Sequence, residues 1–200
     1  MASLLIAVAI ITKEDLLGPL FAISDDLERA KDELRSNDDS YSRRNYIRVL
    51  FASIELAIYL LKRTVLIAAS SESGALTFAE LAMLREQAFS LDENGKVRIR
   101  ENFLRVADNL RFTIGCVEKG FGLSLNFDVA NKHWADFKQA IKIRNRITHP
   151  KTHQDLDITD EEIAVAKRVG DWFSEFVIDW FRKFLVTAKP VYEIDAGLLC

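Results

Sequence analysis

The residues best suited to chemistry lie in the segment 144–150, which reads RNRITHP. Arg144 supplies a charge that persists at any physiological pH, and His149 supplies an imidazole, a group that changes its charge near neutral pH. A permanent cation can bind a phosphodiester, and an imidazole can move a proton on it. The pattern therefore indicates a site directed at a phosphate.

An amphipathic helix must position this segment. Pro150 disfavours helical geometry for the residue before it, so His149 should lie at or just past the end of a helix spanning about 128–148. Unpaired carbonyls and the negative end of the helix dipole favour a protonated imidazole there. The helix is predicted from apolar residues at helical spacing, namely Trp134, Phe137, Ile141 and Ile147.

The pair is distinguished by its neighbours. Arg146 and His153 fit a similar spacing, but only the first pair has Asn145 after the arginine and a proline after the histidine. This stretch resembles the Arg-x(4–6)-His signature of the HEPN superfamily, and the helix order resembles that family loosely over residues 40–188. The resemblance implies an all-α bundle that usually dimerises, and in many members a metal-independent ribonuclease of toxin, antiphage or CRISPR-associated systems.

Metal-independent RNA cleavage assigns a role to each residue of the motif. The substrate's 2′-hydroxyl attacks the neighbouring phosphate, and His149 acts as base for that proton or as acid for the departing 5′-oxygen. Arg144 holds the non-bridging oxygens, and Asn145 hydrogen-bonds the phosphate or His149. The products are a 2′,3′-cyclic phosphate and a 5′-hydroxyl. Because one imidazole is a weak catalyst for two proton transfers, we expect a homodimer with a shared cleft, as the resemblance also implies.

Several basic residues are candidates for binding the rest of an RNA. The segment 132–153 contains six Lys or Arg and one acid, Asp136. It is either a solvated helix face or a site for one or two phosphates. The formal net charge of −3 argues against non-specific coating of nucleic acid. We expect Arg146, Lys151 and Arg48 to contact substrate.

Glu55 is the one charge in the apolar run 49–61, so it must pair, be protonated or face a polar space. Either it occupies an exposed stripe of the helix near Arg48, or it faces the Arg144 and His149 cleft and orients one of them. A comparable acid is implied for some HEPN ribonucleases. The sequence leaves both arrangements open.

Other chemistries find less support. His149 and His153 have the spacing of a helical zinc pair, but Pro150 lies between them and no third ligand is near, so we expect no metal and no cofactor. The segment 120–122, Gly-Phe-Gly, lacks the third glycine and the preceding strand of a dinucleotide fingerprint, so we read it as a turn. His133, beside Trp134, is expected to be a packing or surface residue.

Length and cysteine content bound the organisation. Two hundred residues suit one domain, and the two distant cysteines, Cys116 and Cys200, suit a reducing compartment. The apolar stretch 3–11 lacks the basic flank of a signal peptide and is too short to span a bilayer. It is read as a buried strand or helical turn. We expect a cytoplasmic protein that does not enter membranes.

The fold predicted is a single HEPN-like domain over residues 1–200, an all-α bundle of about five helices. Its core covers 40–188, preceded by N-terminal helices in 1–39 and followed by a tail, 189–200. A break is predicted at Gly18-Pro19, and the Asn94-Gly95 dipeptide predicts either a small β-hairpin near 90–99 or an irregular loop. The helices are predicted over 20–36, 41–70, 77–89, 101–119, 128–148 and 159–188, the last ending at Lys189-Pro190.

Two functional classes follow from these residues. The first is an endoribonuclease, a toxin or defence effector with RNA as substrate and a cognate antitoxin or regulatory protein as a possible partner. The second is a non-catalytic helical dimer that binds RNA, a nucleotide or a protein through the same cleft. Cleavage that persists in EDTA and disappears in Arg144 and His149 variants distinguishes the two.

Overall fold

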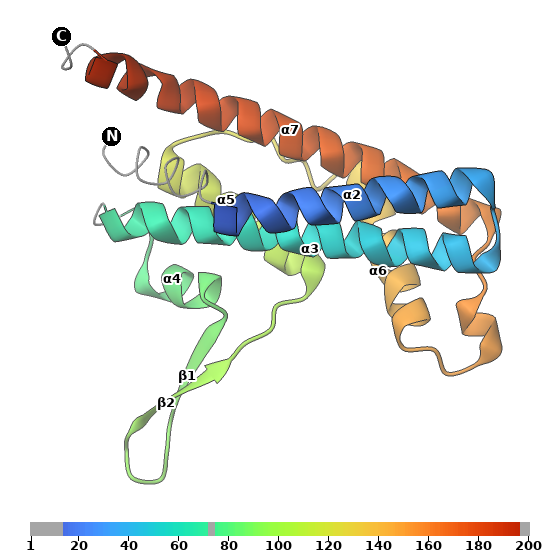
Figure 1. Ribbon diagram of the computed structural model, residues 1–200. Helices are drawn as coiled ribbons and strands as arrows, with labels where there is room; N and C mark the ends of the chain where they lie inside the picture. Colours follow the sequence, from blue (N-terminus) through green and yellow to red (C-terminus); the bar gives the residue numbers. More distant parts are fainter. Residues whose placement is uncertain (1–13, 72–74, 197–200) are drawn as a thin grey trace. The chain divides into compact units, whose positions relative to one another are not determined.

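The computed structural model describes residues 14–71 and 75–196, and side chains within 18–69 and 75–183 (Figure 1). These residues form six α-helices, one short 3₁₀ helix (η1) and one two-stranded sheet, which confirms the predicted all-α class with a small hairpin. The predicted elements within residues 1–13 lie outside the described residues.

The described elements belong to two compact units. One comprises residues 58–71, 75–125 and 183–196, and the other comprises 14–57 and 126–182. The long helices α3 (Ser40–Ser71) and α7 (Asp160–Ala196) contribute residues to both units. Every residue of the predicted site belongs to the second unit.

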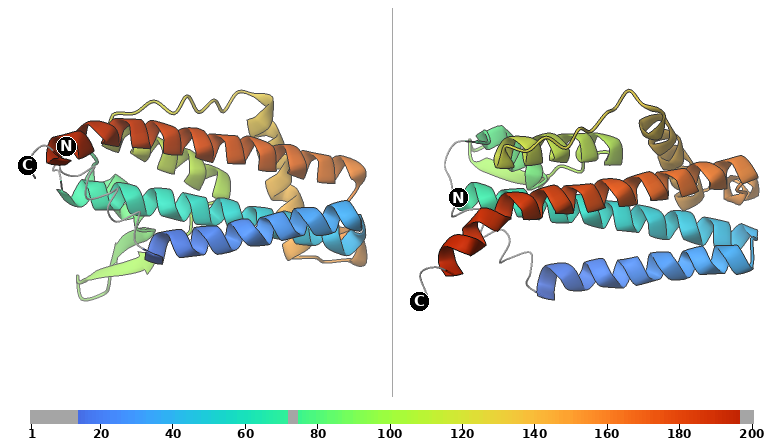
Figure 2. Two further views of the ribbon diagram at one scale, coloured as in Figure 1. Left: turned by 45° about the horizontal axis from the view of Figure 1, so that its top comes forward. Right: turned by 90° about the horizontal axis from the view of Figure 1, so that it is seen from above.

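The second unit begins with α2 (Glu14–Ser36), which turns at residues 37–39 into the first half of α3 (Figure 2). Asp39 starts α3, because its Oδ1 accepts hydrogen bonds from the backbone N–H groups of Tyr41 and Ser42, both at 2.8 Å. The unit continues with α6 (Lys132–Thr148), η1 (His153–Leu156) and the first part of α7. Its core includes the buried side chains of Ile47, Leu50, Phe51, Ile54, Phe137, Ile143, Ile147, Val169 and Phe173.

The first unit contains the hairpin. Helix α4 (Phe78–Leu84) starts with the predicted capping box of Thr77 and Glu80. Strands β1 (Gln87–Leu91) and β2 (Val97–Glu101) pair antiparallel, with Phe89 opposite Ile99. The turn contains Asn94-Gly95 as predicted, and Gly95 has the positive φ of 73° that such a turn requires. Helix α5 (Val106–Phe121) follows.

Two predicted helix boundaries in this unit are wrong. The helix predicted over 77–89 ends at Leu84, because Glu86 has a φ of 54° and the next residues join β1. The helix predicted over 101–119 starts only at Val106, since Glu101 pairs with Gln87 in the sheet. In both cases the pairing of β1 with β2 outweighs the helical spacing.

Three glycine or proline signals do not end helices as predicted. Helix α5 passes Gly120 and ends at Phe121, where Gly122 adopts the left-handed cap with φ 63°. Helix α2 continues through Gly18-Pro19, and α7 continues through Lys189-Pro190 to Ala196. A proline removes one backbone hydrogen bond, and both helices tolerate that loss.

The predicted start of the motif helix was four residues early. Helix α6 begins at Lys132, because the Oδ1 of Asn131 accepts the backbone N–H of Trp134 at 2.9 Å. At the N-terminus of α7 the predicted box is present: Thr159 and Glu162 each accept the other's backbone N–H. Across the described ranges, no helix combines the length and the apolar character needed to cross a membrane.

Candidate functional site

The C-terminal turns of α6 carry the motif. One face of α6 is buried through Trp134, Phe137, Ala140, Ile143 and Ile147. This pattern leaves Asn145 exposed and Arg144 partly exposed. The helix ends at Thr148, and the capping residue His149 has φ −125° and ψ 58° and donates its backbone N–H to the carbonyl of Asn145 at 3.0 Å. The predicted position of His149 at the helix end is confirmed.

Arg144 is held by an acid from another helix. Its Nη2 donates to Oε1 of Glu55 on α3 at 2.7 Å, and its Nη1 donates to Oδ1 of Asn145 at 3.3 Å. Its guanidinium carbon lies 6.0 Å from the centroid of the Phe51 ring. The side chain of Arg144 keeps 26 % of its surface exposed and that of Glu55 keeps 42 %. The guanidinium is therefore oriented and still accessible.

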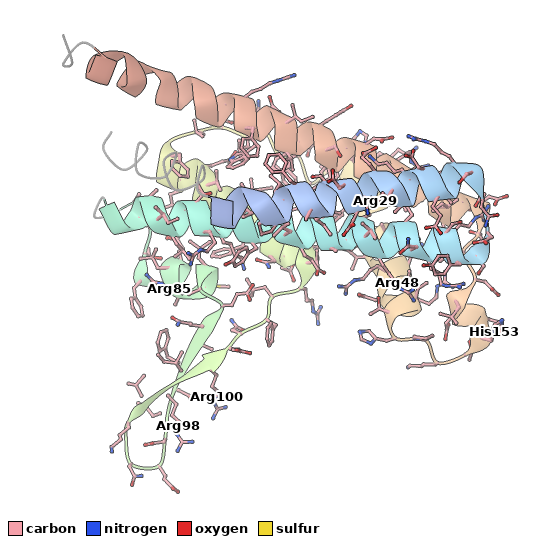
Figure 3. All side chains as sticks on the ribbon, in the orientation of Figure 1. Arg29, Arg48, Arg85, Arg98, Arg100 and His153 are labelled. Atoms are coloured by element: carbon pink, nitrogen blue, oxygen red, sulfur yellow. The ribbon has the colours of Figure 1, made fainter. Side chains whose placement is uncertain are left out.

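The two arrangements left open for Glu55 are thereby distinguished. Glu55 faces α6 and contacts Arg144, whereas Arg48 contacts a different group. Nη2 of Arg48 donates to the carbonyl of Ile147 at 3.3 Å, one of the carbonyls that the end of α6 leaves unpaired. Figure 3 shows Arg48 on the side of α3 next to α6. Arg48 and Glu55 lie seven positions apart, about two helical turns, so one face of α3 lines the end of α6.

His149 is exposed just beyond this pair. Within the described part of the chain, its imidazole makes no hydrogen bond, ion pair or ring contact. The structure thus brings Arg144, Asn145 and Glu55 together, and it leaves the imidazole of His149 at the end of the same helix, in contact with none of them. Neither Arg144 nor His149 is buried.

Arg146 binds protein groups on the opposite side of the motif. Its Nη2 forms a two-pronged pair with Glu162, at 2.8 Å to each carboxylate oxygen. Its Nη1 donates to the carbonyls of Gln154, Asp155 and Asp157 at 3.4, 3.1 and 2.8 Å. These contacts hold the η1 segment against α6 and the start of α7, so the guanidinium of Arg146 is largely engaged by the fold.

Lys151 lies in the turn that Arg146 secures. It is exposed, and its backbone N–H and that of Thr152 donate to Oδ2 of Asp155, both at 2.8 Å. These two backbone hydrogen bonds lower the pKa of the Asp155 carboxyl from its ordinary value. The turn that follows His149 is thus fixed by a carboxylate, and the Lys151 side chain extends from a structured segment.

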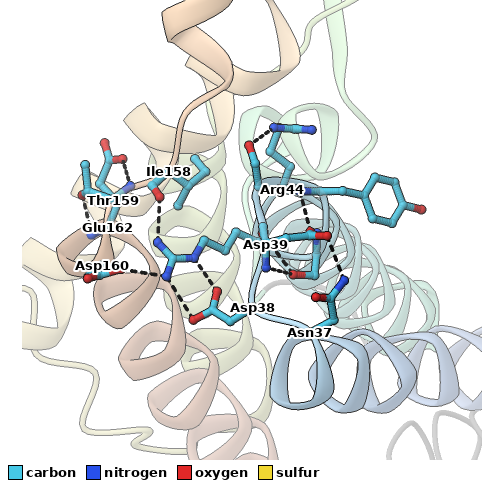
Figure 4. Close-up of polar contacts among 12 residues, drawn as sticks. Asn37, Asp38, Asp39, Arg44, Ile158, Thr159, Asp160 and Glu162 are labelled. Atoms are coloured by element: carbon cyan, nitrogen blue, oxygen red, sulfur yellow. Dashed lines mark hydrogen bonds and ion pairs between the residues drawn. The ribbon is translucent and has the colours of Figure 1, made fainter.

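Two arginines to which the sequence analysis assigns no role bind the backbone that runs from the end of η1 into α7. Arg43 contacts Asp38 and Asp160 and donates to the carbonyl of Ile158 at 2.9 Å. Figure 4 labels these three partners. Arg44 donates to the carbonyl of Leu156 at 3.0 Å. The hydrogen bond from Arg43 lowers the pKa of Asp38. Their clustering at the start of α3 is visible in the sequence, but their partners Ile158, Asp160 and Leu156, more than a hundred positions away, are not.

The predicted basic stretch is only partly available to a ligand. Arg144 and Arg146 pair with Glu55 and Glu162, while the lone acid Asp136 pairs with Arg168 at 2.7 Å. The exposed members of the stretch are Lys132, Lys138, Lys142 and Lys151. His133 is exposed and stacks on Trp172, with 6.2 Å between the ring centroids and 4° between the planes, as expected of a packing residue.

No group of three or more His, Cys, Asp or Glu side chains suited to a metal ion occurs among the described residues. His149 and His153 lie on either side of Pro150, one at the cap of α6 and the other in η1. No family model, curated protein or solved structure matches this chain.

Proposed function

We propose that this protein is a metal-independent endoribonuclease in which Arg144 binds the scissile phosphate and His149 transfers a proton. The observation that carries the proposal is the 2.7 Å contact of Glu55 with Arg144, which lies on the same helix whose end carries the exposed imidazole of His149. A carboxylate that orients a guanidinium engages only part of its five N–H donors, so others can donate to a phosphate. An exposed arginine alone would lose more conformational freedom on binding RNA.

The reaction uses the 2′-hydroxyl of RNA as nucleophile. His149 removes its proton as the 2′-oxygen bonds to phosphorus, and the bond from phosphorus to the 5′-oxygen breaks. The 5′-oxygen leaves with a proton from a second acid. Arg144 stabilises the negative charge that grows on the non-bridging oxygens, a contribution of roughly 3 kcal/mol in comparable sites.

The second acid is the reason to propose a homodimer. Each chain offers one imidazole at the end of α6, and the transfer needs a base and an acid at the same time. Two copies around a twofold axis supply both, as well as two Arg144 side chains for one phosphate. Light scattering of the purified protein tests the dimer directly.

The decisive experiment is cleavage of total tRNA and mRNA in EDTA. Arg144→Ala and His149→Ala should each lower the cleavage rate by at least about a hundredfold. The matched controls are Arg168→Ala, which breaks the 2.7 Å pair between Arg168 on α7 and Asp136 on α6, and His153→Ala in the neighbouring turn. Products must carry a 2′,3′-cyclic phosphate, and a 2′-deoxy substitution at the cut site must abolish cleavage. Cleavage unaffected in both test variants would refute the assignment.

A toxin or defence role is part of the same proposal. Expression should arrest growth in wild type and not in Arg144→Ala, and a cognate antitoxin or regulatory protein would relieve the arrest. The growth assay tests the biological role, whereas the cleavage assay with purified protein tests the chemistry.

One observation favours a second function, a non-catalytic dimer that binds RNA, a nucleotide or a protein. Glu55 offsets the charge of Arg144, and the described structure contains no contact between Arg144 and the His149 ring. Such a site binds a phosphate without completing the proton transfer. Filter binding that weakens in Arg144→Ala while no cleavage occurs in wild type would select this alternative.

A further inference from the structure

A cavity away from the motif lies between the segment that precedes α6 and helix α7. Its volume is about 230 Å³, and all of its lining residues fall within 126–179, in the second unit. Three aromatic rings and three carboxylates line it. These are Phe127, Trp172 and Phe176, and Asp128, Glu175 and Asp179.

The rings form a corner. The centroid of Phe127 lies 5.8 Å from that of Trp172 and 5.3 Å from that of Phe176, with the two phenyl planes at 67°. All three rings remain half-buried, whereas the neighbouring Phe137 and Phe173 are 0 % and 4 % exposed. The three rings therefore present surface to the cavity in addition to packing on the core.

The charged part of the lining is acidic, and the uncharged polar residues that line the cavity are Asn126 and Asn131. Asp128, Glu175 and Asp179 are exposed, and no lysine or arginine is among the residues that line the cavity. The carboxylate of Asp128 is fixed, because its Oδ1 accepts the backbone N–H of Ala130 at 2.7 Å. Trp172 is also fixed by the stacked ring of His133.

Aromatic faces and carboxylates both attract positive charge. The faces of Trp and Phe rings bind cations whose charge is spread over alkyl groups, because such ions lose little hydration when they contact a ring. A small metal ion needs several oxygen ligands at close range and gains little from rings. We propose that this cavity, the aromatic–acidic pocket, binds a small alkylammonium cation.

This site shares no residue with the Arg144 and His149 motif and does not rest on the proposed ribonuclease activity. The proposal predicts that the pocket distinguishes a cationic ligand from a neutral ligand of the same shape. Choline and 3,3-dimethylbutan-1-ol have nearly the same shape and differ in the charge of the central atom. A purely apolar pocket would bind both alike, whereas a cation site would select choline.

The test is an NMR titration of the full-length ¹⁵N-labelled protein with each compound, followed through the Trp172 indole N–H, which a Trp172→Phe variant assigns. Choline should shift this signal saturably, and the neutral alcohol should not. Phe176→Leu, which keeps an apolar side chain but removes a ring, should weaken choline binding between about twofold and about 30-fold. Glu175→Gln should also weaken it.

Glu161→Gln, in the first turn of the same helix, is the matched control and should change nothing. Far-UV circular dichroism and a thermal midpoint confirm that each variant is folded. Equal binding of the alcohol and choline, absence of any shift with choline, or equal binding by Phe176→Leu and wild type would each overturn the proposal.

Discussion

Oε1 of Glu55 lies 2.7 Å from Nη2 of Arg144, a contact that joins α3 to α6 across 89 positions of sequence. The pair is only partly buried, with 42 % of the Glu55 side chain and 26 % of the Arg144 side chain exposed. Its contribution to stability is therefore small. Its consequence is geometric, since it fixes one edge of the guanidinium, whose Nη1 also donates to Asn145, while part of the side chain stays at the surface.

This contact predicts opposite effects of Glu55→Gln on binding and on catalysis. The amide keeps an acceptor but removes the charge that offsets Arg144, so RNA should bind several-fold more tightly, while the maximal single-turnover rate falls by about tenfold because the guanidinium loses its orientation. The unfolding free energy should change by less than about 1 kcal/mol. Single-turnover cleavage and filter binding measure the two effects.

If Glu55 only stabilised the fold, Glu55→Gln would lower the free energy of unfolding and would not shift RNA affinity and the single-turnover rate in opposite directions. Glu55→Asp, which keeps the charge on a shorter side chain, should recover part of the rate. If Glu55→Gln alters neither the rate nor RNA affinity, Glu55 does not position Arg144 for substrate.

Replacing each of the two arginines of the motif with alanine is predicted to affect different properties, stability for Arg146 and cleavage for Arg144. Arg146 binds both oxygens of Glu162 and three backbone carbonyls, so Arg146→Ala should lower the unfolding free energy by about 1.5–3 kcal/mol. Arg144→Ala should cost less than about 1 kcal/mol and abolish cleavage. Urea denaturation of both variants, with cleavage assayed well below the transition, separates the roles. Equal loss of stability in the two would contradict this assignment.

The sequence predicted this region because local signals dominated there. Pro150 and the apolar spacing of α6 were enough to place His149 at the helix end, and Thr159 with Glu162 marked the start of α7. The sequence did not indicate the contacts between residues that lie far apart along the chain. Nothing local indicates that Arg146 would bind Glu162 and η1, or which of two arrangements Glu55 adopts, because these choices are made when α3, α6 and α7 pack.

The hairpin shows the same limit in the fold. The Asn94-Gly95 dipeptide predicted the turn, but residues on both sides of the turn were assigned to helices. Pairing of Phe89 with Ile99 and of Leu91 with Val97 overrides the helical spacing around them. Likewise the sequence predicts a helix end at Gly120, although the left-handed conformation that ends α5 belongs to Gly122.

Two helical glycines are predicted to respond in opposite directions to alanine. At Gly115 an added Cβ meets nothing within 4 Å, so Gly115→Ala should stabilise by about 0.5–1 kcal/mol through helix propensity. At Gly170 the Cβ would lie 2.7 Å from Oη of Tyr46, which is 2 % exposed, so Gly170→Ala should destabilise by about 1–3 kcal/mol.

Thermal or urea denaturation measures both changes. Tyr46→Phe removes the clashing oxygen, so the combination of Tyr46→Phe with Gly170→Ala should recover stability relative to Gly170→Ala alone. Equal stabilisation by alanine at both glycines would show that Tyr46 moves aside without cost.

The last prediction concerns acid stability and the first turn of α4. The pKa of Glu80 is lowered to about 2 from an ordinary value of 4.5, first by the backbone N–H of Thr77 and then by Lys119 and the Thr77 hydroxyl. A carboxyl with a depressed pKa in the folded state binds its proton more readily when unfolded. Its stabilisation is therefore complete above pH 4.5 and is lost as the pH falls from 4.5 through about 2.

Glu80→Gln removes this proton linkage while keeping a side chain that can accept the Thr77 N–H. The stability difference between wild type and Glu80→Gln should be largest at neutral pH and should shrink as the pH approaches 2, as measured by denaturant unfolding at a series of pH values. Lys119→Met removes only the 2.9 Å ion pair between Lys119 and Glu80. The free energy of unfolding of this variant should therefore keep part of the pH dependence that Glu80 gives to the wild type. A difference between wild type and Glu80→Gln that stays constant across this range would mean that Glu80 caps α4 equally well with and without its charge.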